Sequence, residues 1–380
     1  MKKIFSVALA VVAALALVSC APEAPKTIKI GTIQPLTGAI AVYGKNVTNA
    51  VQLAVDEVNA AGGIGGKKVE LIVEDDSFKP DNTVAAFKKL VTKDQVVAIV
   101  GALTSNCTLS ITALAQGAKI PLITPTSTND KVTDAGDYVF QACYKDSFQG
   151  KVVANFAATT LKAKTVGILF DNANDYSKGL KTNFEATFTA DGGQVVSESY
   201  ATGDKDFNAQ IAKIKAAKPD ALFLPDYYNA VSLLAKQIRA AGITVPLLGA
   251  DGWDDAVGTD NADLVGAYYS NHFSKEAASD TAKAYLAAYN TKYGYDTDAL
   301  AALGYDATKI LLNSIAAADK AGKLTSEEIR NQLAATKGTF VTGDISFDAN
   351  RNTVKSAVIV QIGAGDDKKL FTKYVATVNP

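Results

Sequence analysis

The sequence is poor in the residues from which metal centres and nucleophilic active sites are usually built. Its 380 residues include one histidine, one methionine, one tryptophan and three cysteines. This leaves almost no material for a metal cluster, an iron–sulfur centre or a Cys/His nucleophile. No G-x-S-x-G motif occurs in the chain either. We therefore expect a protein that is not an enzyme and that holds no metal or cofactor.

An excess of either charge is also missing. The chain carries 38 Lys and Arg against 39 Asp and Glu, a formal net charge of −1. Without a basic field a polyanion is an unfavourable partner, so we expect no binding of nucleic acid. The composition, 48% hydrophobic and 20% charged, is instead typical of a large globular protein. The length favours two domains.

Apolar runs long enough to matter for a membrane are absent except at the N-terminus. Lys2 and Lys3 precede an apolar stretch over 4–18, which has the order of an export signal and is shorter than the ~20 residues of a spanning helix. The stretch ends in Leu-Val-Ser-Cys20, which resembles a bacterial lipoprotein box. We expect residues 1–19 to be a signal peptide and 20–26 a linker. Cys20 would then be the lipidated end, although an ordinary signal peptide that ends in cysteine remains an alternative.

These features predict an exported protein, lipid-anchored to the cell membrane at the cell surface or in the periplasm. Contact with the membrane would be made through the lipid alone.

The body of the chain alternates short apolar strands with amphipathic helices, the pattern of a parallel sheet with crossover helices. A first series covers about 125 residues, a second, similar series begins after Gly150, and three further helices and a strand follow His272. This tail is too short for a third domain, so we expect the chain to cross between two α/β halves more than once. The expected strands are 26–32, 69–73, 96–100, 120–123, 165–170, 194–200, 221–224, 245–248 and 355–362, and the expected helices are 47–58, 81–93, 105–117, 147–162, 176–191, 206–217, 229–241, 276–292, 298–318 and 326–335.

Seven segments distributed over nearly the whole chain carry recognisable motifs. They are IGTIQPLTGAIAVYG at 30–44, VNAAGGIGGKKVELIVEDD at 58–76, GALTSNCTLSI at 101–111, IPLITPTSTN at 120–129, FQACYKDSFQG at 140–150, LFDNANDYSKG at 169–179 and LLGADGWDD at 247–255. Taken in this order, they resemble the type I solute-binding proteins of bacterial ABC importers, specifically the branch that binds branched-chain amino acids.

The resemblance implies an α/β fold of two Rossmann-like lobes, with parallel central sheets, joined by a multi-strand hinge. Residues 27–145 plus about 274–350 would form lobe 1, and residues 146–273 plus about 351–380 would form lobe 2. The implied function is that of a monomeric receptor that captures a neutral L-amino acid, with Leu, Ile or Val preferred, and delivers it to the permease of an ABC importer. A binder of another small amino acid or amide, or a sensory protein, is the alternative on the same fold.

Hydroxyl side chains follow two successive strands of the first half. Ser105 begins a helix after one strand, where unpaired backbone N–H groups favour a carboxylate. Thr126 and Thr128 follow the next strand, and ligands of open α/β sheets bind at the carboxyl ends of strands. The resemblance implies that Ser105 and Thr128 bind the ligand carboxylate and that Thr126 meets its ammonium group. Leu103 and Thr104 belong to the same ligand-binding segment.

The second half offers a charge and aromatic walls. Asp251 follows a strand and is our choice for the ammonium partner, although many family members have Glu at this position. The resemblance places Tyr43, from the first lobe, and Tyr176 and Tyr227, from the second, in the ligand wall. Trp253, two residues beyond Asp251, is expected at the edge of the cleft.

For several other polar residues the sequence predicts structural roles. Cys107 and Cys143 are either a disulfide or two small buried side chains. Asp146 and Gln149 lie at the first crossing between lobes and are expected in the hinge. His272 is expected to be an isolated surface or core histidine.

Two acidic pairs complete the set. Asp75-Asp76 and Asp254-Asp255 are expected to be solvated loop carboxylates, because neither has a third ligand at a fixed spacing.

Overall fold

The computed structural model describes residues 27–259 and 261–380. The expected signal peptide, the linker and the lipidated Cys20 therefore lie outside the described residues. Among the helices of the described part, none is both long and apolar enough to cross a membrane.

The first lobe is built on a five-stranded parallel sheet with the strand order β2-β1-β3-β4-β5. Its central strand β3, Ala98–Gly101, is apolar throughout, and all four of its residues are buried because helices cover both faces of the sheet. The strands are β1 (Thr27–Gln34), β2 (Lys68–Asp75), β3 (Ala98–Gly101), β4 (Leu122–Thr124) and β5 (Val139–Gln141), and the helices of this lobe are α2 (Ala41–Ala60), α3 (Pro80–Thr92), α4 (Ser105–Ala118), η1 (Val132–Ala135), α10 (Ala299–Lys320) and α11 (Ser326–Ala334).

The second lobe is built on a seven-stranded mixed sheet with the order β15-β14-β10-β9-β8-β6-β7. Four neighbouring pairs are parallel, and the C-terminal strands β14 and β15 are added antiparallel at one edge. The strands are β6 (Thr165–Asp171), β7 (Gln194–Tyr200), β8 (Ala221–Phe223), β9 (Leu247–Gly249), β10 (Tyr268–Asn271), β14 (Ala357–Ala364) and β15 (Leu370–Val378), and the helices are α5 (Asp146–Thr159), α6 (Asp175–Ala190), α7 (Asn208–Ala216), α8 (Tyr228–Ala240), η2 (Asp251–Thr259) and η3 (Ala262–Leu264).

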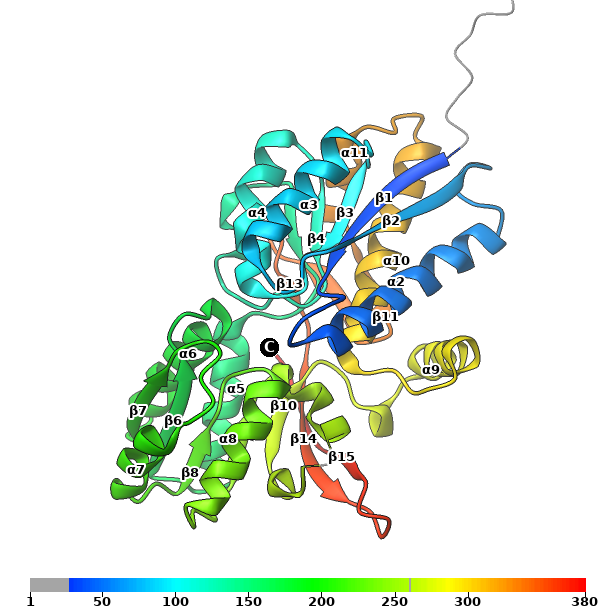
Figure 1. Cartoon of the computed structure of the whole chain (residues 1–380). Helices are drawn as coiled ribbons and strands as arrows, with labels where there is room; N and C mark the ends of the chain where they lie inside the picture. Colours follow the sequence, from blue (N-terminus) through cyan, green and yellow to red (C-terminus); the bar gives the residue numbers. More distant parts are fainter. Residues whose placement is uncertain (1–26, 260) are drawn as a thin grey trace, which may run out of the picture.

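The chain passes between the two sheets three times. The passages lie between β5 and α5, between β10 and the short helix η4 (Lys275–Ala277), and between the small sheet that precedes β14 and β14 itself. That three-stranded sheet consists of β11 (Lys337–Phe340), β12 (Gly343–Phe347) and β13 (Thr353–Val354). Figure 1 shows these passages as thin connections between the two lobes, with α9 (Asp280–Tyr293) beside the junction.

The α/β architecture with two sheet-based lobes is confirmed, and each expected helix and strand overlaps an observed one. The sequence pattern missed β5, β10, the β11–β13 sheet and β15. Apart from β15, which has nine residues and pairs with β14, these strands have two to five residues each. So short a segment shows too little alternation to be recognised, and its pairing comes from long-range contacts.

Candidate functional site

The candidate site lies between the lobes, where strands of both sheets end. From the first lobe, β3 leads into Ser105, and β4 leads into Thr126 and Thr128. From the second lobe, β6 leads toward Tyr176 and β9 leads into Asp251. Because parallel strands present their carboxyl ends at one edge, each sheet brings its own residues together, and the hinge turns the two edges toward each other.

The first-lobe side of the cleft is a surface of hydroxyl groups around the start of α4. Thr104 occupies the N-cap position of this 14-residue helix but makes no capping hydrogen bond. The hydroxyls of Thr104 and Thr128 are buried and have no partner among the described residues. Ser105 Oγ accepts a hydrogen bond from Asn129 N at 3.3 Å, and Thr126 Oγ1 donates to the Leu103 carbonyl at 2.6 Å.

This arrangement leaves donors facing the cleft. The first N–H groups of a helix have no partner within the helix, and here no side chain caps them. Two free hydroxyls lie beside this positive helix end. The first-lobe side is therefore suited to hold a carboxylate.

The second-lobe side is centred on Asp251, which is 2% exposed. Its Oδ1 accepts hydrogen bonds from the Tyr176 hydroxyl at 2.7 Å and from Gln149 Nε2 at 2.9 Å, and its Oδ2 lies 3.0 Å from His272 Nε2. Gln149 also accepts from the Asp251 backbone N–H at 3.0 Å. Asp251 is therefore held in place by three side chains from three different segments.

His272 is a core residue, and it is not isolated. Its ring stacks on Tyr144 with a centroid distance of 3.7 Å. Burial lowers the pKa of His272 to about 4, so the ring is neutral near pH 7 and can donate from Nε2 to Asp251. Since Tyr144 and His272 lie on two of the three passages between the lobes, this pair links the hinge to Asp251.

Asp146, the first residue of α5, carries the most unusual charge in the cleft. Its side chain is 0% exposed, and neither carboxylate oxygen has a partner among the described residues. Burial raises the pKa of Asp146 well above its usual range, the nearby Thr128 hydroxyl opposes this, and the charges of Asp251 and Asp130 add to it. A buried carboxylate without donors is a strong acceptor for a cationic group.

The three tyrosines expected in the ligand wall are buried and lie beside these charges. Tyr176 and Tyr227 stack with a centroid distance of 4.9 Å and an interplanar angle of 13°. Tyr43, from α2 of the first lobe, donates from its hydroxyl to the Gly252 carbonyl at 2.6 Å. Phe78, also from the first lobe, packs edge-on against Tyr227 at 5.7 Å. The wall is therefore built by both lobes.

Contacts at the rim join the lobes as well. Asn106 Oδ1 accepts from the Asp175 N–H at 2.7 Å, and Asn129 Nδ2 donates to the Asp175 carbonyl at 3.0 Å. A Cβ added at Gly179 would lie 2.6 Å from Asp146 Oδ2 and 3.3 Å from Asn129 Nδ2, so α6 closely approaches the cleft floor and the first lobe. These contacts show that the cleft is closed in this structure.

The structure corrects the expectation for Trp253 and decides between the two alternatives for the cysteines. Trp253 does not lie at the cleft edge: its ring is 0% exposed, its Nε1 donates to the Leu224 carbonyl at 2.9 Å, and it packs within the second-lobe core. It follows Asp251 in a 3₁₀ helix, whose turn directs the indole away from the cleft. Cys107 and Cys143 are free buried thiols in separate hydrophobic clusters, so the reading as small buried side chains describes them.

In each acidic pair one member is buried and the other is half-buried, so neither pair is freely solvated. Asp75 Oδ1 accepts from the N–H groups of Leu36 and Ser77, and Asp76 is 1% exposed, so this pair fixes the loop that carries Phe78. Asp254 is 8% exposed and is bonded across the lobe junction. In both pairs the loops fold back onto a neighbouring element, which a local pattern does not reveal.

Sequence reasoning also undervalued Asp146, Gln149 and His272. Asp146 and Gln149 belong to the motif FQACYKDSFQG, which was a signal for a ligand-binding role. Their place at a crossing between the lobes favoured a hinge role instead. His272 directly follows β10. Recognition of that strand would have placed this histidine at a carboxyl strand end, beside the other site residues.

The fold and the cleft are those of a two-lobed protein suited to binding a small solute, with a negative and a positive end, between its lobes. A family model described as periplasmic binding protein matches residues 27–367. The chain belongs to this periplasmic binding protein family.

Individual relatives agree with the family. The chain is 35% identical over 310 residues to a Leu/Ile/Val-binding protein of Rhizobium johnstonii, covering 80% of each chain. A crystal structure of a leucine-binding protein from Thermotoga maritima is similar with a TM-score of 0.87, at 33% identity, covering 93% of this chain and 99% of that one. A branched-chain amino acid transporter substrate-binding protein from Streptococcus pneumoniae, solved with isoleucine, has a TM-score of 0.85 at 37% identity, covering 93% and 100%.

Proposed function

We propose that the protein captures a neutral L-amino acid, with leucine, isoleucine or valine preferred, and presents it to the permease of an ABC importer. The observation that carries this proposal is the pairing of opposite binding surfaces in one closed cleft. The cleft holds an uncapped helix end with hydroxyl groups and, next to Thr128, the buried carboxylate of Asp146, whose oxygens have no hydrogen-bond partner among the described residues. A zwitterion satisfies both surfaces at once.

The carboxylate of the amino acid would bind at the start of α4. The hydroxyls of Thr104 and Thr128 and the first N–H groups of the helix supply donors, with Ser105 beside them. Anion binding at a helix N-terminus is favoured by the helix dipole and by these unpaired N–H groups.

The ammonium group would lie between Asp146 and Asp251. Asp251 already accepts from Tyr176, Gln149 and His272, whereas both oxygens of Asp146 are unpartnered among the described residues. We therefore assign Asp146 the direct charge contact and keep Asp251 as a second, oriented acceptor. Thr126, whose hydroxyl is directed to the Leu103 carbonyl, supports the same end of the ligand.

The side chain of the ligand would pack against Tyr43, Tyr176, Tyr227 and Leu103, which are all buried. The Tyr176 hydroxyl is occupied by Asp251 and Gly252, and the Tyr43 hydroxyl is occupied by the Gly252 carbonyl. Their remaining surface is mostly aromatic carbon, which favours an aliphatic side chain over a charged one. The names of the relatives point to the same ligands.

Calorimetric titration of the purified mature protein tests this function. L-Leucine, L-isoleucine and L-valine should bind with 1:1 stoichiometry. Two matched leucine analogues are the controls: 4-methylpentanoate, which lacks the ammonium group, and isopentylamine, which lacks the carboxylate. Both should bind at least a hundredfold more weakly, because each leaves one buried surface unpaired. Equal binding of 4-methylpentanoate would overturn the amino-acid assignment in favour of a simple organic acid. Conversion of any of these compounds to a product would contradict a purely binding role.

We propose further that Cys20 anchors the exported protein to the membrane through a lipid. The support is the order of charged residues, apolar run and Cys20 in the sequence. Metabolic labelling with a fatty acid, followed by membrane fractionation, should label wild type and leave a Cys20→Ser variant unlabelled. Equal labelling of both would refute the anchor.

A further inference from the structure

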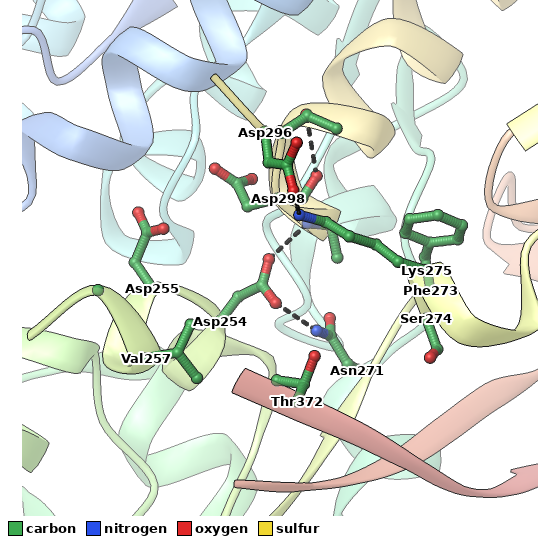
Figure 2. Close-up of a pocket in the computed structure, with 13 residues that line it drawn as sticks. Asp254, Asp255, Val257, Asn271, Phe273, Ser274, Lys275, Asp296, Asp298 and Thr372 are labelled. Carbon is green, nitrogen blue, oxygen red and sulfur yellow. Dashed lines mark hydrogen bonds and ion pairs between the residues drawn. The ribbon is translucent and has the colours of Figure 1, made fainter. Parts of the chain in front are cut away.

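A second cavity, separate from the amino-acid cleft, lies at the junction of the lobes. Its volume is about 170 Å³. Figure 2 shows carboxylates converging on it from two sides, with Asp254 and Asp255 on one side and Asp296 and Asp298 on the other. We call Asp254, Asp255 and Asp298 the junction carboxylates. Lys275 is the one basic side chain among its lining residues.

The junction carboxylates belong to both lobes. Asp254 and Asp255 lie in η2, directly after Asp251 and Trp253 of the second lobe, whereas Asp298 is the N-cap of α10, a first-lobe helix. Asp254 Oδ2 accepts a hydrogen bond from the backbone N–H of Ala299, the first residue of α10. This bond crosses the junction, so the distance between these carboxylates depends on the closure of the cleft.

The charge in this cavity is poorly compensated. Asp298 has donors from Asn46 Nδ2 at 2.6 Å and from Ala301 N at 2.6 Å. Asp255 Oδ2 is buried and has no partner among the described residues. The Lys275 ammonium pairs with the exposed Asp296 at 3.3 Å, and its charge offsets only part of the rise in the pKa of the junction carboxylates. Within the described part of the chain, no group of His, Cys, Asp and Glu is arranged to hold a metal ion that could balance this charge.

We propose that closure of the cleft takes up a proton at the junction carboxylates, so that ligand affinity increases as the pH falls. This inference rests on the proposed function, because it uses the binding of an amino acid as the event that closes the cleft.

The direction of this pH dependence follows from the charge and the burial of the junction carboxylates. In an open molecule, η2 and the start of α10 would separate and their carboxylates would be hydrated, with ordinary acidity. In the closed structure, burial and the neighbouring carboxylates raise the pKa of Asp254 to about 7 and the pKa of Asp255 well above its usual range. The closed form therefore binds more protons than the open form across the neutral range. Proton uptake therefore favours closure at pH values below the neutral range. This contribution to closure is lost as the pH rises through the neutral range.

Several other buried groups also have shifted pKa values. His272 titrates near pH 4, below the window, and the charge of Asp146 is balanced by the ligand's own ammonium group. Asp226 is bonded to Tyr200 and to the Tyr227 N–H, and Asp306 is bonded to the N–H groups of Val341 and Thr342. Asp226 also lines a pocket with Phe78 of the first lobe, and burial lowers the pKa of Lys355, on the passage before β14, to about 8. The Asp255→Asn and Asp298→Asn variants separate the junction carboxylates from these groups, because neither variant alters Asp226 or Lys355. The ionisable groups that face the junction carboxylates from the neighbouring elements are Tyr43 of α2, Tyr228 of α8, Tyr269 of β10, Lys275 of η4, Tyr285 of α9 and Asp296 of the loop before α10.

The test is calorimetry of leucine binding to the full mature protein between pH 5.5 and 8, in pairs of buffers with different ionisation enthalpies. Wild type should take up protons on binding, and its Kd should rise by up to about tenfold per pH unit for each proton taken up. Asp255→Asn, which removes the charge and keeps the shape, should bind more tightly than wild type at pH 8. It should also flatten the pH dependence and take up fewer protons.

Two further variants complete the experiment. Asp298→Asn retains an oxygen that can cap α10, and it should flatten the pH dependence in the same way even if Asp255→Asn fails to fold. Asp280→Asn removes a fully exposed carboxylate at the start of α9 and should keep the wild-type slope. A wild-type Kd that is constant within twofold over the pH range would overturn the inference and leave the amino-acid function intact. Absence of binding at every pH would instead refute the proposed function.

Discussion

The two faces of the cleft are constructed in different ways. The first-lobe face consists of short hydroxyl side chains at the ends of β3 and β4, and its bonds join neighbouring strand ends: Thr126 bonds to Leu103, 23 residues away, and Ser105 bonds to Asn129, 24 residues away. The second-lobe face is built from long side chains joined over large distances, as in the bond between Gln149 and Asp251, 102 residues apart. One face follows from strand and helix geometry, and the other depends on the assembled hinge.

This difference has a functional consequence. The carboxylate-binding face should be rigid and tolerant of single changes, because several donors share one charge. The proposed ammonium-binding face concentrates its charge in two aspartates, so single substitutions there should have larger effects.

The largest effect is expected for Asp146→Asn. Loss of the unpartnered carboxylate strands the ligand's ammonium group and should cost about 3–5 kcal/mol, or roughly two to four decades in Kd. The thermal stability of the empty protein should stay the same or rise, because a buried charge without donors is removed. Calorimetry and thermal unfolding measure both quantities, with the exposed Asp191→Asn as control. Binding within a few fold of wild type would return the ammonium role to Asp251 alone.

Asp251→Ala should differ from Asp146→Asn in its effect on stability as well as on binding. It should weaken binding by about 3 kcal/mol and also destabilise the empty protein, since buried Tyr176, Gln149 and His272 lose their shared acceptor. A drop in the midpoint of thermal unfolding, absent in Asp146→Asn, is the distinguishing readout. Unchanged stability would mean that the network reforms without Asp251, and that the contrast between the two faces is overstated.

Thr128→Ala tests the shared donors of the first-lobe face. One of several hydroxyl and N–H donors is lost, so affinity should fall by about 1–3 kcal/mol, less than for either aspartate. Thr128→Ser, which keeps the hydroxyl, should remain close to wild type. If Thr128→Ala were as harmful as Asp146→Asn, the carboxylate would depend on this single donor.

Gly179→Ala tests the closure itself. The added methyl group would lie within 2.6 Å of Asp146 Oδ2 and would press on Asn129 of the first lobe, which hinders full closure. Kd should rise about tenfold, chiefly through faster dissociation, with little change in association. Stopped-flow kinetics measures the two rates separately. Gly192→Ala is a poor control because of its positive φ, so Gly117→Ala, which has open space around it, is the better one.

The smallest effect is expected for the fluorescence of Trp253. Because the indole is fully buried in the second-lobe core, its emission maximum should shift by no more than a few nanometres on saturation with leucine. A large shift with bound ligand would show that η2 rearranges on closure.

The sequence by itself determined the alternation of strands and helices, the residues at the ends of β3, β4 and β9, and the motifs of the family. These features are local, since periodicity and strand ends are encoded within a few residues. It also indicated Tyr43, Tyr176 and Tyr227, which the structure buries around the cleft.

Only the tertiary structure decided which acidic groups are charged partners and which are structural. Asp146, Asp254 and His272 acquire their character from burial and from contacts across three chain passages, none of which a local pattern encodes. The indole of Trp253 likewise enters the core because of the turn that follows Asp251. Desolvation and long-range hydrogen bonds depend on the whole assembled fold, so these roles become visible only when both lobes are in place.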